Sequence, residues 1–327
     1  MSPPPPEGAE AAEGTVVRST GSWYTVQPDG AAEPVQARAR GRFRLDAEEL
    51  DETNPIAVGD RVTLRMEDDG TGLITEIQPR RNQLSRRAAG RRVGKEHVIA
   101  ANVDAAWCVQ SAFKPKFNAG FVDRLLVMAE AYHLDAGLVV NKADLLAGQP
   151  RAQEALAFWK NLYAGLGYPV LFTSAVTGEG VGAFRAALLG KTSVVAGPSG
   201  VGKSSLLNAV DPSLGLRTGE VSEKTQKGKH TTTFATLYPL AGGGYVVDTP
   251  GIREYGIWDM APAELGGYFV EFRPYIAHCR FPDCTHDHEP GCAVTAAVDE
   301  GAISPERYGS YLNILASVRE GEADVGR

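Results

Sequence analysis

Residues 197–204 of the chain read GPSGVGKS, the pattern G-x-x-x-x-G-K-[ST] of a loop that binds phosphate groups. Its glycines let the backbone wrap closely enough to point N–H groups at phosphate oxygens. Lys203 would reach the β- and γ-phosphates of a nucleotide, and Ser204 would bind Mg²⁺. The alternative is a glycine-rich turn that binds nothing, but a predicted strand before the loop and a predicted helix after it favour the phosphate loop. The expected nucleotide contacts here are Gly197, Pro198, Ser199, Gly200, Val201, Gly202, Lys203, Ser204 and Ser205.

A second polar stretch, NKAD, ends a predicted strand and contains the residue types that read guanine. Asp144 can accept hydrogen bonds from guanine N1–H and N2–H₂ together, whereas adenine offers no such pair of donors. Asn141 can meet O6 and N7 of the base, and the stem of Lys142 can lie against the loop. A solvated polar loop is the alternative. The pattern predicts a nucleotide site that selects GTP.

Two shorter segments complete the predicted nucleotide site. TSA follows another predicted strand and contributes Ser174 and Ala175, whose backbone N–H could donate to O6 of guanine. VVDTPG is a predicted strand that ends in D-x-x-G. It would place Asp248 near Mg²⁺, through a water molecule, and the N–H of Gly251 at the γ-phosphate. The D-x-x-G pattern is weak alone and gains its weight from the phosphate loop upstream.

A segment rich in threonine and lysine, residues 217–234, lies between the phosphate-loop helix and the next predicted strand. That is the position of a switch ordered by the nucleotide, and a disordered surface loop is the alternative. Of the three threonines at 231–233, we assign Thr232 to the Mg²⁺ shell. Ras-like GTPases orient the attacking water with a glutamine just after D-x-x-G, but that position is Ile252 here. His230 is our candidate catalytic residue for this task, and a solvent-facing histidine is the alternative.

A cysteine-rich segment, CRFPDCTHDHEPGC, predicts a metal site. It offers four soft or borderline ligands within fourteen residues: Cys279, Cys284, His286 and Cys292. A Cys₃His set with no open position is typical of structural zinc, bound one per chain. His288 could replace His286, and His278 is adjacent to the first cysteine. Three buried thiols without a metal are the alternative, but a loop rich in Pro and Gly has no core to bury them.

The order of these motifs is unusual. In an ordinary GTPase the base-reading loop follows the phosphate loop, whereas here Asn141 precedes Gly197 by 56 positions. Cutting the usual order between D-x-x-G and N-K-x-D, and joining the old ends, gives this arrangement. Such a circular permutation preserves the sheet and the site, because the termini of a domain tend to lie close together at its surface.

The secondary structure expected around these motifs falls into distinct parts. Short β-rich runs near the N-terminus predict a small closed barrel of the OB-fold type, which either binds RNA or only packs on its neighbour. Alternating strands and helices then predict a mostly parallel α/β sheet. The predicted parts are a disordered tail (1–14), the OB-fold barrel (15–80), a basic linker (81–99), the circularly permuted GTPase domain (100–255) and a mainly helical zinc-binding domain (256–327).

The stretch RRNQLSRRAAGRRVGK, residues 80–95, carries seven cations and no acid. Arginine forks match phosphates in a bidentate manner, so this asymmetry favours contact with RNA. The expected contacts are Arg86, Arg87, Arg91 and Arg92. The alternative is a solvated linker whose charges serve solubility.

Composition sets limits on the class of protein. With a net charge of −7, the chain is not a generally basic nucleic-acid coat, although local basic patches remain compatible with it. No apolar run approaches the ~20 residues that span a bilayer, and the first residues do not resemble a signal peptide. We therefore expect a cytoplasmic protein whose four cysteines stay reduced. We assign no role to the proline-rich start.

Taken together, these motifs resemble the ribosome small subunit-dependent GTPase A family (RsgA, also called YjeQ). The resemblance rests on NKAD ahead of GPSGVGKSSLLN, followed by GKHTTT, DTPGIRE and CRFPDCTHDHEPGCAV. It implies a monomeric GTPase that binds the small ribosomal subunit late in its maturation, contacts rRNA through its outer domains, hydrolyses GTP with ribosome-stimulated turnover and leaves afterwards.

Two other functions are weighed against this one. A metabolic P-loop ATPase or small-molecule kinase would not need NKAD with TSA. A zinc-stabilised RNA-binding scaffold with a vestigial nucleotide site would not need an intact set of Lys203, Ser204 and Asp248.

Overall fold

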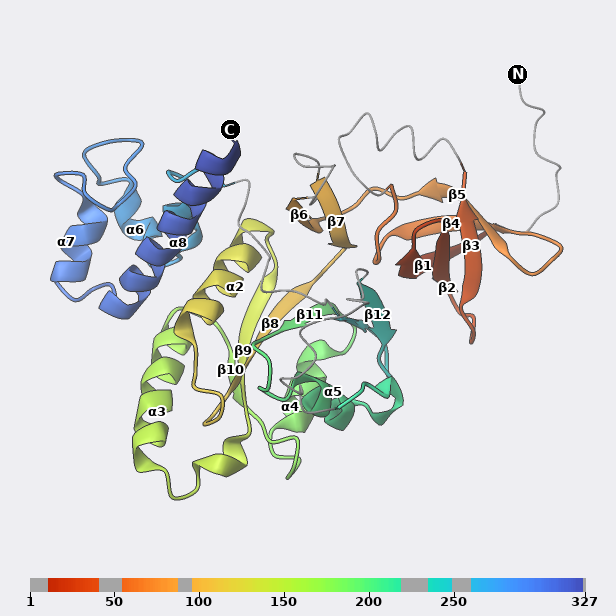
Figure 1. The fold of residues 1–327 in the computed structure, drawn as a ribbon, viewed down its shortest axis with the longest axis horizontal. Coiled ribbons are helices and arrows are strands. Elements are labelled where there is room, and N and C mark those ends of the chain that lie inside the picture. The colour runs from red at the N-terminus through yellow and green to blue at the C-terminus, as the bar shows by residue number, and fades with distance from the viewer. Residues whose placement is uncertain (1–10, 41–54, 88–95, 219–234, 249–259, 326–327) are drawn as a thin grey trace. The chain divides into compact units, whose positions relative to one another are not determined.

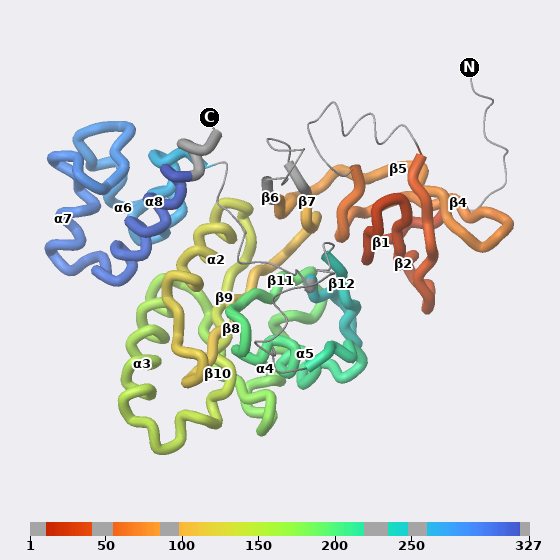
Figure 2. The backbone as a smooth tube through the Cα atoms, viewed as in Figure 1, coloured from red at the N-terminus to blue at the C-terminus, as the bar shows by residue number. Residues whose placement is uncertain are grey.

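The computed structural model of the chain describes residues 11–40, 55–87, 96–218, 235–248 and 260–325 (Figures 1 and 2). The chain divides into two compact units. The first unit contains residues 1–104, 188–194 and 224–254, and the second contains residues 105–187, 195–223 and 255–327. The domain boundaries expected from the sequence stay a prediction.

The N-terminal part of the first unit is a closed barrel of five strands. The strands are β1 (Ala11–Thr20), β2 (Trp23–Pro28), β3 (Val35–Ala39), β4 (Arg61–Met66) and β5 (Gly72–Ile77). Strand β1 pairs with both β2 and β4, and β3 pairs with β5 in parallel, so the sheet closes on itself. The barrel expected from the short β-rich runs is confirmed.

Alternating burial explains why these runs form a barrel. In β2 every second side chain is buried, and in β4 Val62 and Leu64 are buried with Thr63 less so between them, as in a sheet with one face toward a core. The inward side chains form one apolar cluster, which includes Val16, Tyr24, Val26, Val62, Leu64 and Ile74. The barrel therefore has a core of its own.

The remainder of the first unit contains two further groups of strands. β6 (Gln83–Arg87) and β7 (Glu96–Ala101) form an antiparallel pair within the basic segment. β11 (Thr192–Ala196) runs parallel to β13 (Tyr245–Asp248), which pairs antiparallel with β12 (Thr236–Pro239). The last pair forms a hairpin over residues 236–248.

The second unit begins with three parallel strands, β8 (Ala105–Ser111), β9 (Asp135–Asn141) and β10 (Val170–Phe172). Every residue of β8 is buried, as expected for a strand covered on both faces. The helices between and after the strands are α2 (Ala119–Ala131), α3 (Pro150–Gly165), α4 (Val181–Leu188) and α5 (Lys203–Val210). This alternation is the α/β pattern expected from the sequence.

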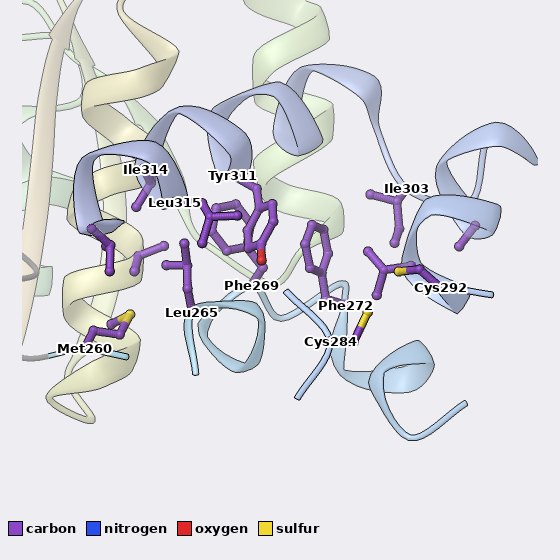
Figure 3. Packing of buried hydrophobic residues seen from close by; sticks show 14 residues of the cluster. Met260, Leu265, Phe269, Phe272, Cys284, Cys292, Ile303, Tyr311, Ile314 and Leu315 are labelled. Atoms are coloured by element: carbon purple, nitrogen blue, oxygen red, sulfur yellow. The ribbon is translucent and has the colours of Figure 1, made fainter. Parts of the chain in front are cut away.

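The C-terminal part of the second unit is helical. It contains the 3-10 helix η5 (Leu265–Tyr268) and the helices α6 (Arg273–Ile276), α7 (Ala293–Asp299) and α8 (Pro305–Val325). Figure 3 shows Phe269, Phe272 and Tyr311 packed together, with ring centroids 5.0–5.3 Å apart. Val127 of α2 belongs to the same apolar cluster, so the C-terminal helices pack on α2.

Buried charges reinforce this packing. Arg307 of α8, 1% exposed, donates to Asp123 of α2 at 2.5 Å and to Glu271 at 2.6 Å. Burial alone would lower the pKa of Arg307, but hydrogen bonding to Glu271 and the charge of Asp123 together raise it. Tyr163 of α3 donates to the same oxygen of Asp123 at 2.8 Å. One charge cluster therefore joins α2, α3 and α8.

Candidate nucleotide site and metal centre

The phosphate loop follows β11 and leads into α5, and its glycines are required for different structural reasons. Gly200 and Gly202 have φ values of 81° and 91°, in the left-handed region that favours glycine. Gly197 lies so close to the carbonyl oxygen of Val109 in β8 that an added Cβ would collide with it. The three glycines of the motif are thus required by the path of the backbone itself.

The end of the loop is arranged to receive an anion. Gly202 caps α5 without a side-chain hydrogen bond, so no capping side chain occupies the N–H groups of the first helical turn. These groups lie at the positive end of the helix and can bind an anion. The ammonium group of Lys203 folds back over the loop and donates to the carbonyl oxygens of Gly197 at 2.7 Å and Pro198 at 3.1 Å. Ser204 is half-buried in the first turn of α5.

The base-reading motif is fastened to the phosphate loop by its own side chains. Asn141, 1% exposed at the end of β9, donates through Nδ2 to the carbonyl oxygen of Val201 at 3.0 Å. Lys142 has a φ of 63° and donates through Nζ to the carbonyl oxygens of Gly200 at 2.6 Å and Lys114 at 2.8 Å. The NKAD and GPSGVGKS motifs, far apart in the chain, are therefore neighbours.

The carboxylate of Asp144 is held by the TSA segment. Ser174 donates through Oγ to Oδ1 of Asp144 at 2.6 Å, and the same Oγ accepts from the backbone N–H groups of Val176 and Thr177. Within the described residues, Oδ2 of Asp144 makes no hydrogen bond and the N–H of Ala175 has no acceptor. One acceptor and one donor thus remain for a ligand at this loop.

Thr173 is a site residue that the sequence reasoning missed. Its hydroxyl, fully buried, donates to Oδ1 of Asn141 at 3.2 Å and so fixes the orientation of that amide. A signal was present, because Thr173 begins the TSA segment. The hydrogen bond from Lys142 to the carbonyl of Lys114 had no such signal, because it involves only the backbone of the second residue.

Other predicted nucleotide residues are only partly described. The backbone of Asp248 ends β13, where Val247 lies opposite Val194 of the parallel strand β11. The side chain of Asp248 lies outside the described part of the chain, as do the whole of His230, Thr232 and Gly251. Their roles stay predictions.

Four side chains of the cysteine-rich segment converge on one point. Cys279, Cys284, His286 and Cys292 place their ligand atoms within 4.8 Å of one another. The Sγ atoms of Cys279 and Cys292 are 3.9 Å apart, and Nδ1 of His286 lies 3.5 and 3.4 Å from them. A tetrahedral zinc ion, with Zn–S near ~2.3 Å, requires sulfurs roughly 3.8 Å apart. The arrangement fits such an ion.

Burial sets the protonation of two of these side chains. Burial raises the pKa of the Cys284 thiol to about 12, so a thiolate there needs a positive partner. Burial lowers the pKa of His286, which favours the neutral imidazole that a metal binds. The side chain of His288 is 76% exposed and lies 3.5 Å from Asp287, away from the cluster. His286 is therefore the histidine that completes the set.

The loop around the cluster is held by α8 and by one carboxylate. Tyr308 and Tyr311 of α8 donate to the carbonyl oxygens of His286 and Thr285, at 2.8 and 2.5 Å. Glu289 accepts hydrogen bonds from the N–H and hydroxyl of Thr285. Gly266 of η5 faces the imidazole of His286, and a Cβ there would come within 2.7 Å of the ring. No sequence motif indicates this close approach.

The basic segment contains two arginines that already have partners. Arg80 forms a bidentate pair with Asp60, which is fully buried, at 2.8 and 3.0 Å. Arg81 pairs with Asp104 at 2.9 Å. Both side chains hold the first unit together, so the cations available to a ligand are fewer than the sequence suggests.

The four arginines expected to contact RNA are only partly described. The backbones of Arg86 and Arg87 lie on β6, opposite His97 and Glu96. Their side chains, and all of Arg91 and Arg92, lie outside the described part of the chain.

Among the helices of the described segments, none is long and apolar enough to cross a membrane.

Comparison with known proteins places the chain within one family. Residues 77–258 match the family described as RsgA GTPase, and residues 13–74 match the RsgA N-terminal domain. The chain is 43% identical to the small ribosomal subunit biogenesis GTPase RsgA of Phocaeicola vulgatus, over 95% of this chain and 98% of the relative. The chain is also 45% identical to the protein of the same name from Gemmatimonas aurantiaca, over 92% of this chain and 95% of the relative.

Solved structures give the same result. The fold is similar to YjeQ from Thermotoga maritima, with a TM-score of 0.77 and 36% identity over 94% of this chain and 99% of that one. It is also similar to YloQ, described as a circularly permuted GTPase, with a TM-score of 0.73 and 29% identity over 95% and 96% of the two chains.

Proposed function

The chain belongs to the RsgA GTPase family, and we propose that it hydrolyses GTP to GDP and phosphate in the late maturation of the small ribosomal subunit. One observation carries this proposal. Asn141 and Lys142 of the base-reading motif hydrogen-bond to the phosphate loop at Val201 and Gly200. A loop for guanine and a loop for phosphate are thus held in a fixed relation, as a single bound nucleotide requires.

Guanine selection rests on Asp144 and Ala175. Ser174 holds one carboxylate oxygen of Asp144 and leaves the other without a partner among the described residues. That oxygen accepts from the N1–H and N2–H₂ edge of guanine, while the N–H of Ala175 donates to O6. Adenine presents neither group in these positions, so its binding would leave buried polar groups unpaired.

Phosphate binding rests on the loop and on Lys203. When the nucleotide binds, the ammonium group of Lys203 leaves the carbonyl oxygens of Gly197 and Pro198 and donates instead to β- and γ-phosphate oxygens. It then stabilises the charge that develops during phosphoryl transfer. The N–H of Gly251 is assigned to the γ-phosphate, and Ser205 to the nucleotide contacts of the first helical turn.

Mg²⁺ accompanies the nucleotide in this family of enzymes. Ser204, Thr232 and Asp248 would hold it, because hydroxyl and carboxylate oxygens are the donors that Mg²⁺ prefers. When bound, the ion neutralises charge on the phosphates. These assignments come from the sequence motifs.

Positioning of the attacking water is assigned to His230, because Ile252 has no donor or acceptor for it. We expect His230→Ala to bind GTP normally but to lose roughly 10²–10⁴-fold of the subunit-stimulated rate. The basal rate should change less, because we expect the ribosome to bring His230 into place. Full stimulation of the variant would exclude His230 and implicate a group of the ribosome.

Zn²⁺ is the ion that we assign to the Cys₃His cluster, as a structural ion bound one per chain. Its four protein ligands leave no open position for a substrate. The ion would fix the loop on which α8 and η5 pack, and so would shape the C-terminal surface without taking part in hydrolysis.

Contact with rRNA is assigned in part to Arg86, Arg87, Arg91 and Arg92. Replacing all four by glutamine should weaken binding to small subunits and reduce the dependence of the binding constant on salt, because fewer counterions are released. An unchanged salt slope would assign these arginines to solubility.

Two binding measurements test the proposed function together. Labelled GTP bound to the full chain should be displaced by unlabelled GTP and GDP, and not by ATP at the same concentrations. The chain should also sediment with purified small subunits in the presence of a non-hydrolysable GTP analogue, and less so with GDP. Equal displacement by ATP would favour a metabolic P-loop enzyme, and no sedimentation with subunits in any nucleotide state would remove the ribosomal role.

A further inference from the structure

An aromatic ladder runs from the core of the second unit to its surface along α3. Tyr163, fully buried, stacks near Trp159 with ring centroids 6.0 Å apart, and Trp159 stacks on Phe117 at 5.5 Å. Phe158 packs edge-on against Trp159 at 5.0 Å and is itself 45% exposed. The outer end of the ladder therefore presents aromatic surface to solvent.

The loop and the helix that carry this ladder are rich in cations. The loop at 112–118 and helix α3 together carry four cations, Lys114, Lys116, Arg151 and Lys160, and one acid, Glu154. All five of these side chains are exposed. Two of the cations lie over aromatic rings, Lys114 over Phe113 at 5.6 Å and Lys160 over Phe172 at 5.9 Å. This excess of positive charge stands out in a chain with a net charge of −7.

The loop that supports the patch is fixed in place. The carbonyl oxygen of Lys114 accepts from Oγ of Ser111 at 2.7 Å and from Nζ of Lys142 at 2.8 Å. Asn118 then caps α2 by accepting from the N–H of Phe121 at 3.0 Å. The hydrogen bond from this loop to the base-reading motif uses the backbone carbonyl of Lys114. The aromatic and cationic side chains of the loop are not among the residues that we assign to the nucleotide.

We propose that Phe117, Phe158 and Trp159, with Lys114 and Lys116, form a docking patch for unpaired nucleotides of small-subunit rRNA. In this α3 aromatic patch, Phe158 stacks on a base, Trp159 and Phe117 hold Phe158 in position, and the lysines neutralise neighbouring phosphates. The proposal rests on the proposed function, which supplies the rRNA. Charge and aromatic surface together favour RNA as the occupant, because phosphates pair with the lysines and an unpaired base can stack on the exposed Phe158.

A series of variants at Phe158 separates stacking from simple apolar contact. Phe158 is exposed, so its replacement does not open the core. Affinity for purified small subunits, measured with a non-hydrolysable GTP analogue, should be kept in Phe158→Tyr. It should fall roughly fivefold to hundredfold in both Phe158→Leu and Phe158→Ala, because neither side chain can stack on a base. Leu189→Ala, which removes a similarly exposed apolar side chain elsewhere, is the matched control and should bind as the parent does.

The lysines give a second, independent readout. In Lys114→Gln with Lys116→Gln, the slope of log K against log salt should become shallower by about 0.7 for each phosphate that is no longer neutralised. GTP affinity of the free chain should be the same in every variant, because none of these side chains belongs to the nucleotide loops.

The outcomes separate this proposal from the proposed function. Failure of the parent chain to bind subunits would remove the proposed function itself. If the parent binds and Phe158→Leu binds equally well while Phe158→Ala does not, the patch contacts an apolar protein surface and the RNA proposal is wrong. If all Phe158 variants bind as the parent does, the patch does not face the subunit, and the proposal is likewise overturned.

Discussion

The nucleotide loops and the C-terminal helical domain lie in the same unit but are stabilised in different ways. In the loops, short motifs place each other through hydrogen bonds between their own side chains and nearby backbone, as Asn141 and Lys142 do with Val201 and Gly200. In the C-terminal domain, an apolar cluster, a buried charge cluster and four metal-type ligands gather residues from several elements. The loops are thus arranged to bind a ligand, whereas the C-terminal domain is stabilised mainly by burial.

This difference predicts opposite consequences of damage. A change in the loops should reduce nucleotide binding and leave the stability of the fold nearly unaltered. A change in the C-terminal domain should reduce the stability of that domain and leave GTP affinity unaltered. Three variants, each paired with a control variant, test this separation.

Loss of the metal cluster should have the largest effect. Cys284→Ser should lower bound zinc from one ion per chain to none and should raise the rate of amide hydrogen exchange across residues 260–320 by orders of magnitude, because metal binding is part of the folding free energy. GTP affinity should stay within about twofold. The measurements are metal analysis, hydrogen exchange and nucleotide binding on the same sample.

Cys108→Ala serves as the control for this variant, because Cys108 is a buried cysteine of β8 outside the cluster. It should keep its zinc. Zinc at one per chain in Cys284→Ser, or loss of GTP turnover without loosening of the C-terminal helices, would contradict a structural metal.

Breaking the buried charge cluster should come next. Arg307→Met leaves Asp123 and Glu271 as uncompensated buried anions, which costs about 3–5 kcal/mol in the free energy of unfolding. This cost is measured by denaturant unfolding, monitored with a probe that reports on the C-terminal helices. Adding Asp123→Asn to the same chain should recover part of the loss, because one buried anion is removed.

Arg319→Met is the matched control, since Arg319 pairs with Asp287 on the surface, with 40% and 34% of the side chains exposed. Its cost should be at most about 1 kcal/mol. Equal costs for the two arginine variants would show that burial is not what gives the Arg307 cluster its strength.

The smallest effect should come from the base-reading loop. Asp144→Asn places an amide donor opposite the guanine N1–H and N2–H₂ donors, which costs about 1–3 kcal/mol, so GTP affinity should fall about tenfold or more. The melting temperature should match that of the parent. Asp299→Asn, an exposed acid at the end of α7, is the control. Unchanged GTP affinity in Asp144→Asn would mean that the base is read elsewhere.

The two regions also differ in how far the sequence predicts them. The phosphate and base loops are contiguous motifs whose geometry follows from a few glycines and from the ends of strands, so their positions could be predicted. The barrel was predictable for a related reason, because strands such as β2 and β4 carry an alternation of more and less buried residues within a few positions.

The charge cluster could not be predicted, because Arg307 and Asp123 are 184 residues apart and each looks like an ordinary polar residue of an amphipathic helix. The choice between His286 and His288 was open for a similar reason. It depends on a left-handed backbone at His286, with φ of 54°, which the residue type does not indicate. Arg80 and Arg81 belong to the stretch of seven cations, and no local pattern reveals that they are paired, because their partners, Asp60 and Asp104, lie 20 and 23 residues away in the chain.

GTP turnover by the full chain, alone and with purified small ribosomal subunits, is the decisive measurement for a ribosome-stimulated GTPase. We expect slow turnover by the free chain, because Ile252 cannot orient the attacking water, and strong stimulation by small subunits but not by large ones. Lys203→Ala, measured in parallel, should abolish both rates. Turnover that is the same with and without small subunits would show that the chain is not a GTPase of this kind.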